Sequence, residues 1–182
     1  MTVTIVVCHL RERRQLLSRC LFYLENQTVR PDAVFVMHGE GGKGDKLEKA
    51  FRLAETSHVM VVDDDDWVSP VLVESIQGFD VDFVGYDALQ TVAGRYAETI
   101  HQETASHICP LRTDLATLIP FTNEYLADIK WTKATAPFVK TEAYVDRPLY
   151  FYDKWNPTAG GWSPPRQVGW WPHNPLNFKW IL

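Results

Sequence analysis

The sequence has few cysteines and no long apolar run, and these absences exclude several classes of protein. Its three cysteines, Cys8, Cys20 and Cys109, are odd in number and lack paired ligand spacing, which argues against a disulfide framework and a zinc site. No apolar run approaches the ~20 residues that span a bilayer, and residues 1–4 show no basic leader. We therefore expect buried thiols, no transmembrane segment and a cytoplasmic protein.

An excess of basic residues is also missing. The formal net charge of −5 argues against a basic coat that binds nucleic acid. The exception is the segment 147–182, which has Asp153 as its single acidic residue and carries five of the seven tryptophans: Trp155, Trp162, Trp170, Trp171 and Trp180. Because the chain from residue 156 is rich in proline, glycine and tryptophan, we expect residues 156–182 to form an irregular tail or lid.

What is present favours a single α/β domain. A chain of 182 residues with 46% hydrophobic content is long enough for one substantial core. Residues 2–8, 33–37 and 58–62 are apolar runs typical of buried strands. Helices are expected between them, the first with an apolar stripe of Leu17, Cys20, Leu21 and Leu24. This succession predicts an α/β fold with a mostly parallel central sheet flanked by helices.

The second part of the chain is less regular. Residues 81–86 predict another strand, and Gly94 marks the turn of a hairpin that returns along residues 95–100. A helical pattern covers residues 111–118, and Asn123 is expected to cap a further helix that runs through Trp131. Residues 149–152 predict a last strand.

The acidic run Asp63 to Asp66 directly follows the third strand. In open α/β sheets, ligands bind beyond the carboxyl ends of the strands, where this run would lie. Four adjacent carboxylates repel one another, and a hard divalent cation such as Mg²⁺ or Mn²⁺ would relieve the repulsion. The run therefore indicates a metal site, with a solvated acidic loop as the alternative.

Two other segments bear on ligand binding. The glycine-rich loop 38–45 permits a close approach of backbone to a ligand, but it lacks the Gly-Lys-Ser/Thr ending of a Walker loop. The alternative is that this loop is a flexible connection that binds no ligand. Arg11, Arg13 and Arg14 crowd the start of the first helix and oppose its dipole, which indicates either a nearby anion or a solvated face.

Several segments occur in an order that matches one enzyme family. They are the strand 4–7, the helix end 24–28, a strand before a glycine-containing loop, the acidic segment 62–70, the helix 125–131 and the strand 148–152. Together they resemble the family 2 glycosyltransferases, which have the GT-A fold. The acidic segment is similar to the family's Asp-x-Asp-Asp motif. The resemblance covers about residues 3–153 and implies a GT-A domain at 1–155, with a nucleotide-sugar half at about 1–78 and an acceptor half at about 79–155.

The resemblance implies an inverting, metal-dependent enzyme that moves a hexosyl or pentosyl group from a nucleotide diphospho-sugar, with a UDP-sugar as the leading candidate. Asp65 with Asp63 would hold Mn²⁺ or Mg²⁺, and His173 is the candidate histidine ligand near the C-terminus. Asp128 is the implied catalytic base, and Glu124 is its rival on the same helix face. The residues implied in donor binding are Asp63, Asp64, Glu40, His38, Arg11 and Lys43.

The sequence departs from the family pattern at two of these places. Glu40 stands where an aspartate usually holds the nucleotide base, and Ala127 stands where a glutamate commonly precedes the catalytic aspartate. Two other readings therefore stay open. One is a non-catalytic nucleotide-binding or interaction module on the same fold. The other is a nucleotidyltransferase, which ranks last because the first strand is not followed by a glycine-rich loop.

The acceptor has three candidates, which are a base of modified DNA, a saccharide and a lipid-linked intermediate. Small phage-encoded transferases of this kind act on hydroxymethylated pyrimidines in DNA, and a tail of tryptophans and cations suits a base extruded from a duplex. For such an enzyme the location would be the host cytoplasm. Tryptophan also stacks on sugar rings, so a saccharide acceptor is the second candidate. The sequence leaves the oligomeric state open.

Overall fold

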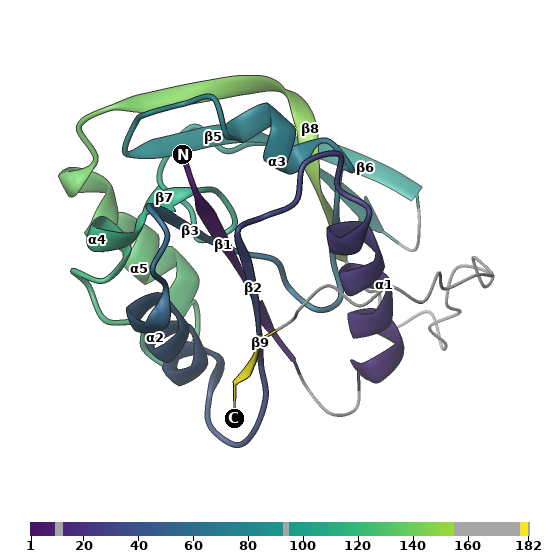
Figure 1. Cartoon of the computed structure of the whole chain (residues 1–182), viewed down its shortest axis with the longest axis horizontal. Helices are drawn as coiled ribbons and strands as arrows, with labels where there is room; N and C mark the ends of the chain where they lie inside the picture. The colour runs from purple at the N-terminus through teal and green to yellow at the C-terminus, as the bar shows by residue number, and fades with distance from the viewer. Residues whose placement is uncertain (10–12, 93–94, 155–178, 182) are drawn as a thin grey trace.

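The computed structural model describes residues 1–9, 13–92, 95–154 and 179–181, and these residues form one nine-stranded mixed sheet with helices on its faces (Figure 1). In chain order the elements are β1 (Val3–Cys8), α1 (Arg14–Glu25), β2 (Ala33–Met37), α2 (Lys43–Leu53), β3 (His58–Val61), β4 (Trp67–Val68), α3 (Leu72–Ile76), β5 (Phe83–Val92), β6 (Arg95–His101), β7 (Leu111–Arg112), α4 (Thr113–Ala116), α5 (Ala127–Thr135), the 3-10 helix η2 (Ala136–Phe138), β8 (Glu142–Lys154) and β9 (Lys179–Ile181).

The strand order is β4-β8-β5-β7-β3-β1-β2-β9, with β6 paired to β5. The strands β3, β1, β2 and β9 are parallel, and β5 is parallel to β8. The pairs β3–β7, β5–β7, β4–β8 and β5–β6 are antiparallel. The predicted strand–helix units are confirmed in β1 to β3, and the sheet as a whole is mixed.

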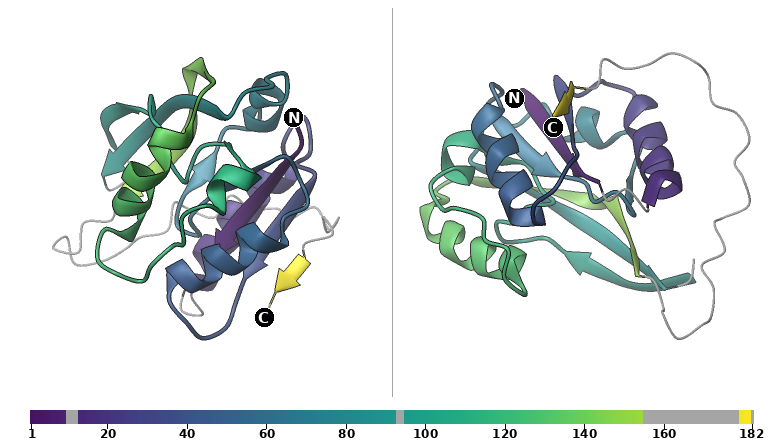
Figure 2. Two further views of the ribbon diagram at one scale, coloured as in Figure 1. Left: turned by 90° about the vertical axis from the view of Figure 1, so that its left-hand side faces the viewer. Right: turned by 90° about the horizontal axis from the view of Figure 1, so that it is seen from below.

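The core lies on both faces of the parallel strands. Val3, Ile5, Val6 and Val7 are buried because β1 lies between β2 and β3. Figures 1 and 2 show α1 on one face of these strands and α2 on the other, as expected for two successive right-handed crossovers. The predicted apolar stripe of α1 is confirmed, since its members are all buried.

Four sequence-based expectations were wrong in part. Residues 111–118 do not form one helix, because Leu111 pairs with both Val59 and Phe83 and bridges the two parts of the sheet. The last predicted strand is longer, since β8 begins at Glu142 and pairs along the whole of β5. Asn123 does not cap its own helix, which begins at Ala127. The expectation of an irregular tail was wrong for residues 179–181, because they form β9 at the edge of the sheet beside β2.

All three cysteines are free, with Cys20 and Cys109 buried and Cys8 partly buried. The hairpin of β5 and β6 is present. Within the described part of the chain, none of the helices is both long and apolar enough to cross a bilayer. The rest of the expected tail, at 156–178 and 182, lies outside the described residues.

Candidate functional site

The acidic run forms a tight turn at the carboxyl end of β3. The backbone N–H of Val62 donates to Val6 O at 2.9 Å, and that of Asp66 donates to Asp63 O at 3.0 Å. The turn separates the four carboxylates. Asp64 and Asp66 are each only 2% exposed, whereas Asp63 and Asp65 are partly exposed. The run is therefore two pairs of aspartates with different surroundings.

The buried pair is held by other parts of the protein. Asp64 Oδ2 lies 3.1 Å from His9 Nδ1, and Asp64 Oδ1 accepts a hydrogen bond from Arg13 at 3.2 Å. Asp66 accepts a 2.7 Å hydrogen bond from the hydroxyl of Tyr150, and the same hydroxyl accepts one from the backbone N–H of Asp63 at 3.2 Å. These contacts fix the turn, so Asp64, which was predicted to contact the donor, is better placed to position the loop.

The partly exposed pair is flanked by cations. Lys43 Nζ lies 2.6 Å from Asp63, and Arg13 lies 2.8 Å from Asp65. Burial would raise the pKa of Asp63, but Lys43 holds that pKa below its usual value. Burial raises the pKa of Asp65 despite Arg13, and the charges of Asp63 and Asp64 raise it further. A cation at Asp65 would therefore relieve an unfavourable charge.

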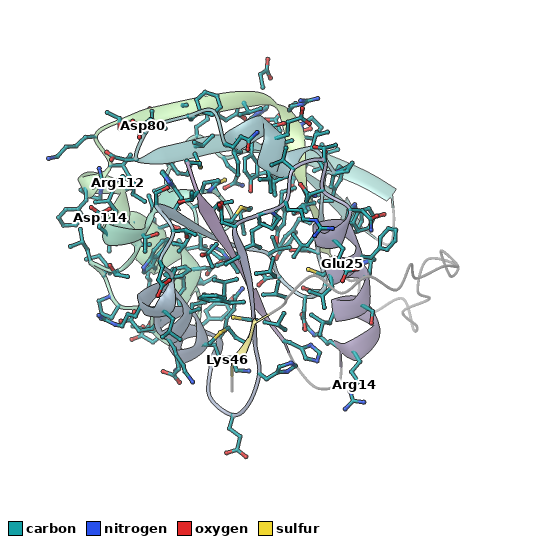
Figure 3. All side chains as sticks on the ribbon, viewed as in Figure 1. Arg14, Glu25, Lys46, Asp80, Arg112 and Asp114 are labelled. Atoms are coloured by element: carbon teal, nitrogen blue, oxygen red, sulfur yellow. The ribbon has the colours of Figure 1, made fainter. Side chains whose placement is uncertain are left out.

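The arginines at the start of α1 were expected either to face an anion or to lie on a solvated surface, and Arg13 faces the anionic carboxylates of the acidic run. Arg13 bonds to both Asp64 and Asp65. Arg19, further along α1, donates to the backbone oxygen of Asp65 and lies 4.6 Å above the centre of the Trp67 ring. Arg14 is exposed on the helix surface (Figure 3), and Arg11 lies outside the described residues.

The carboxylates fit a metal that is shared with a phosphate ligand. Among the residues that the structure describes, no three His, Cys, Asp or Glu side chains are grouped closely enough to hold an ion by themselves. Mg²⁺ sites in phosphoryl-binding proteins commonly use one or two carboxylates and complete the shell with substrate phosphates and water. Asp63 and Asp65 suit that arrangement. His173 lies outside the described residues, so its part in the site stays a prediction.

The glycine-rich loop packs against another segment of this chain. Gly39 and Gly41 have φ values of 91° and 107°, which favour glycine. A side chain at Gly42 would collide with Asn123, and one at Gly44 would collide with the backbone of Thr122. The close approach at these two glycines is to the segment that precedes α5, and the predicted approach to a ligand stays a prediction.

Asn123 caps α2 from a distant segment, alongside Asp45 of the helix itself, which accepts a 3.2 Å hydrogen bond from the backbone N–H of Gly42. Asn123 Oδ1 accepts a 2.8 Å hydrogen bond from the backbone N–H of Gly44, and its Nδ2 donates to Asp45 at 2.7 Å. Of the other donor-site candidates, Glu40 is exposed in the loop and the ring of His38 lies edge-on to His9 at 5.1 Å. Nothing in the sequence indicates which helix Asn123 would cap, since its partner is 79 residues away.

The two candidate bases face different surroundings. Glu124 is exposed and pairs with Lys130, whose hydrogen bond lowers the pKa of Glu124. Asp128, in the first turn of α5, is partly buried. Burial lowers the pKa of Lys43, but Asp63 raises it above its usual value and Asp128 adds to that effect. The structure therefore brings both Asp63 and Asp128 within electrostatic reach of Lys43.

His107 lies at the same site, although no sequence pattern marks it as a functional residue. Its backbone oxygen accepts a 2.8 Å hydrogen bond from the N–H of Val61, directly before the acidic run. Burial and the charge of Lys43 lower the pKa of His107 to about 4, against the opposing charges of Asp63 and Asp128. Two further positioning residues were also missed. Tyr150 bonds Asp66 and the backbone of Asp63 through its hydroxyl. Lys46 is a buried lysine that donates to His9 O at 3.4 Å (Figure 3).

Comparison with known proteins shows the fold. No family model matches the sequence, and no curated protein matches it significantly. Among solved structures, S. aureus TarS 1-349 in complex with UDP-GlcNAc is 16% identical with a TM-score of 0.71, and the match covers 90% of this chain and 62% of that one. The same protein in complex with UDP is 16% identical with a TM-score of 0.70, covering 85% and 61%.

A third similar structure comes from Mycobacterium tuberculosis. It is glucosyl-3-phosphoglycerate synthase in complex with Mn²⁺, UDP and phosphoglyceric acid, with 14% identity, a TM-score of 0.58 and coverage of 87% of this chain and 72% of that one. The chain spans 62% of the length of TarS 1-349 and 37% of the longer TarS structure. The predicted α/β, GT-A-like fold is therefore confirmed.

Proposed function

We propose that this chain is a glycosyltransferase domain that transfers a sugar from a UDP-sugar to an acceptor hydroxyl with inversion, using Mn²⁺ or Mg²⁺. The observation that carries the proposal is the meeting of two kinds of carboxylate at one site. Asp63 and Asp65 lie at the carboxyl end of β3, and Asp128 of α5 acts electrostatically on Lys43, which is bonded to Asp63. Structures of similar fold were solved with UDP-GlcNAc and with Mn²⁺ and UDP.

The donor half of the site supplies charges of both signs. Asp65, with Asp63, would hold the metal, which as a Lewis acid would neutralise the charge that develops on the leaving diphosphate. Lys43 and Arg13 are cations already in place beside these carboxylates. Both can contact diphosphate oxygens, because a cationic nitrogen and a phosphate oxygen form strong charge-assisted hydrogen bonds.

The acceptor half supplies the base. In a single displacement the acceptor oxygen bonds to the anomeric carbon as the bond from that carbon to the diphosphate oxygen breaks. The acceptor's proton passes to Asp128, and the bonding electrons leave with the UDP. One base and no protein nucleophile are sufficient for inversion. General-base help of this kind contributes roughly 10²- to 10⁴-fold in rate. Glu124 is the second candidate, but it is exposed and tied to Lys130.

The acceptor is proposed as a hydroxymethylated base in DNA or a saccharide. Beside Asp128, the side chains of Tyr125, Leu126 and Ile129 are 87%, 46% and 45% exposed. An aromatic ring beside apolar side chains offers a stacking surface for either a base or a sugar ring. The proposed division into a nucleotide-sugar half at about 1–78 and an acceptor half at about 79–155, with His173 of the C-terminal tail as a further metal ligand, completes this proposal.

The experiment is a thermal-shift panel followed by product analysis. UDP and UDP-sugars should raise the melting temperature, and Mn²⁺ should increase that shift, because a ligand that binds only the folded state stabilises it. Intact mass of hydroxymethylated oligonucleotides and of glycans after incubation with UDP-sugars then identifies the acceptor. No shift with any diphosphate compound contradicts the proposal. A shift without transfer or donor hydrolysis would instead support the non-catalytic binding module.

A further inference from the structure

His107 carries a buried nitrogen whose role the fold does not explain. Among the described residues, Nε2 of His107 is one of few buried side-chain nitrogen or oxygen atoms with no hydrogen-bond partner. The ring lies edge-on to Phe121, with 6.2 Å between ring centres. Buried polar atoms in folded proteins are nearly always paired, because an unpaired one costs the free energy of its lost hydration. An unpaired nitrogen at a candidate site therefore indicates a missing ligand group.

The backbone around His107 is fixed on both sides. Its own oxygen accepts from the N–H of Val61 at 2.8 Å, and the oxygen of Ile108 accepts from the hydroxyl of Tyr86. The oxygen of Pro110 accepts from the N–H of Val84 at 3.1 Å. These bonds attach the segment to β3 and β5, so the place of the imidazole is set by the sheet.

The charged groups that act on His107 are those of the proposed site. They are Lys43 from α2, Asp63 from the end of β3 and Asp128 from α5. Lys43 is itself bonded to Asp63. The imidazole therefore shares its surroundings with the group proposed to hold the metal and the diphosphate and with the proposed base.

We propose that Nε2 of His107 hydrogen-bonds a hydroxyl group of the sugar being transferred and thereby selects the donor. This inference rests on the proposed function. The anomeric carbon lies between the leaving diphosphate and the attacking hydroxyl, so the sugar ring occupies the space between Asp63 and Asp128. A hydroxyl both donates and accepts, which suits an imidazole nitrogen in either tautomer. Lys43 and Arg13 are the groups proposed to contact the phosphates, so the imidazole is not needed there.

The test compares the affinity for UDP with that for UDP-sugars in the presence of Mn²⁺. Isothermal titration of UDP, UDP-glucose, UDP-galactose and UDP-GlcNAc gives, for each sugar, the gain in affinity over UDP. In His107→Phe and His107→Asn, the gain for the preferred sugar should fall about 5- to 10-fold, the size of one neutral hydrogen bond. Affinity for UDP itself should stay within about twofold, since the nucleotide does not touch this nitrogen.

A matched control is His101→Phe. His101 pairs with Asp87 on β5, and its side chain is 59% exposed. This variant should keep both the UDP affinity and the sugar-dependent gain. Deoxy-sugar donors identify the hydroxyl, because the wild type should lose affinity for one of them and His107→Phe should not.

The possible outcomes distinguish a failure of this inference from a failure of the proposed function. A wild type that binds no UDP compound overturns the proposed function, and the inference with it. A wild type that binds UDP-sugars, with an unchanged gain in both His107 variants, overturns the inference alone. An equal loss of UDP and UDP-sugar affinity, or no sugar-dependent gain in the wild type, also overturns it. Melting curves of both variants show which of them is folded, and the two substitutions give independent measurements.

Discussion

The two sides of the proposed site are constructed differently. We define the donor side as Arg13, Lys43 and Asp63 to Asp66. These residues come after the carboxyl ends of the parallel strands β1, β2 and β3, and ion pairs join them to one another. The base side, defined as Asn123 and the helix Ala127–Thr135, is a short helix preceded by Leu126, the only non-glycine residue with positive φ among the described residues. It reaches the site because Asn123 and Thr122 pack on the glycine loop. One side lies at the ends of the central strands, and the other is positioned by the contact of the segment before α5 with the start of α2.

The largest expected effect separates the two sides by function. Asp128→Asn should lower kcat about 10²- to 10⁴-fold, because a general base is lost. The dissociation constant for UDP should stay within about twofold, because Asp128 is not proposed to touch the nucleotide. Steady-state kinetics and titration with UDP measure the two quantities.

The matched control is Glu124→Gln, which breaks the exposed pair with Lys130 and should keep kcat within about twofold. If Glu124→Gln removes activity and Asp128→Asn does not, the base is misassigned. If Asp128→Asn weakens UDP binding as strongly as it lowers kcat, the two sides are not functionally separate.

The next effect concerns the metal on the donor side. Asp65→Asn should abolish the Mn²⁺-dependent part of the thermal shift and lower activity about 10²- to 10³-fold, the scale of one lost electrostatic contact to a transition state. Without ligand, its melting temperature should stay equal or rise. The reason is that burial, together with Asp63 and Asp64, raises the pKa of Asp65 despite Arg13, so its charge costs stability at neutral pH.

Asp80→Asn controls for the loss of one negative charge. Asp80 is exposed, and it acts on His58 at the opposite end of β3 (Figure 3). This variant should keep the Mn²⁺ response. A full Mn²⁺ response in Asp65→Asn would remove the metal from the proposal.

A third effect distinguishes the aspartates within the run. Asp64→Ala should lower the free energy of unfolding by about 2–3 kcal/mol, because it removes hydrogen bonds to charged or buried partners and leaves His9 without this partner. Urea denaturation measures the loss. An Asp64→Ala protein as stable as the wild type would show that the buried and partly exposed aspartates do not differ in the way proposed.

The contrast between the two sides also explains what the sequence could predict. The parallel strands and the acidic run were predictable because apolar runs, helical spacing and adjacent carboxylates are local signals. The role of Leu111 as a bridge between β3 and β5 was not, because two residues of strand carry no periodicity. Asn123 was assigned to its own helix since a cap is recognised from neighbouring residues, and its true partner lies on α2.

His107 illustrates the same limit at the site itself. A single histidine between β6 and β7 carries no spacing that would mark it. Its place follows from one backbone hydrogen bond to Val61 and from the packing of its ring on Phe121. Both contacts join segments that are far apart in sequence. Residues that work in pairs across a fold are visible only once the fold is known.

The pH dependence of stability tests how firmly His107 is enclosed between the two sides. Burial and Lys43 lower its pKa to about 4, whereas the unfolded chain has the ordinary value near 6.5. The unfolded state therefore binds more protons between these values, so this contribution is fully present above pH 6.5 and is lost as pH falls toward 4. Over that window, the wild type should lose about 2 kcal/mol more stability than His107→Gln in urea denaturation. Parallel curves for the two proteins would show that the imidazole is accessible to solvent.

The smallest expected effect tests the contact that joins the two sides. Asn123→Ala should lower the free energy of unfolding by about 1 kcal/mol, the usual value of a helix cap, since the backbone N–H of Gly44 loses its partner and Asp45 loses one of two. Because the same contact places α5 against α2, kcat should fall while the affinity for UDP is retained. Asn26→Ala, which removes one exposed hydrogen bond to Phe22 on α1, should leave kcat unchanged. A loss of stability without a change in kcat would mean that Asn123 only caps α2, and that the aromatic packing of Phe121 on Trp131, with ring centres 4.8 Å apart, positions the base side by itself.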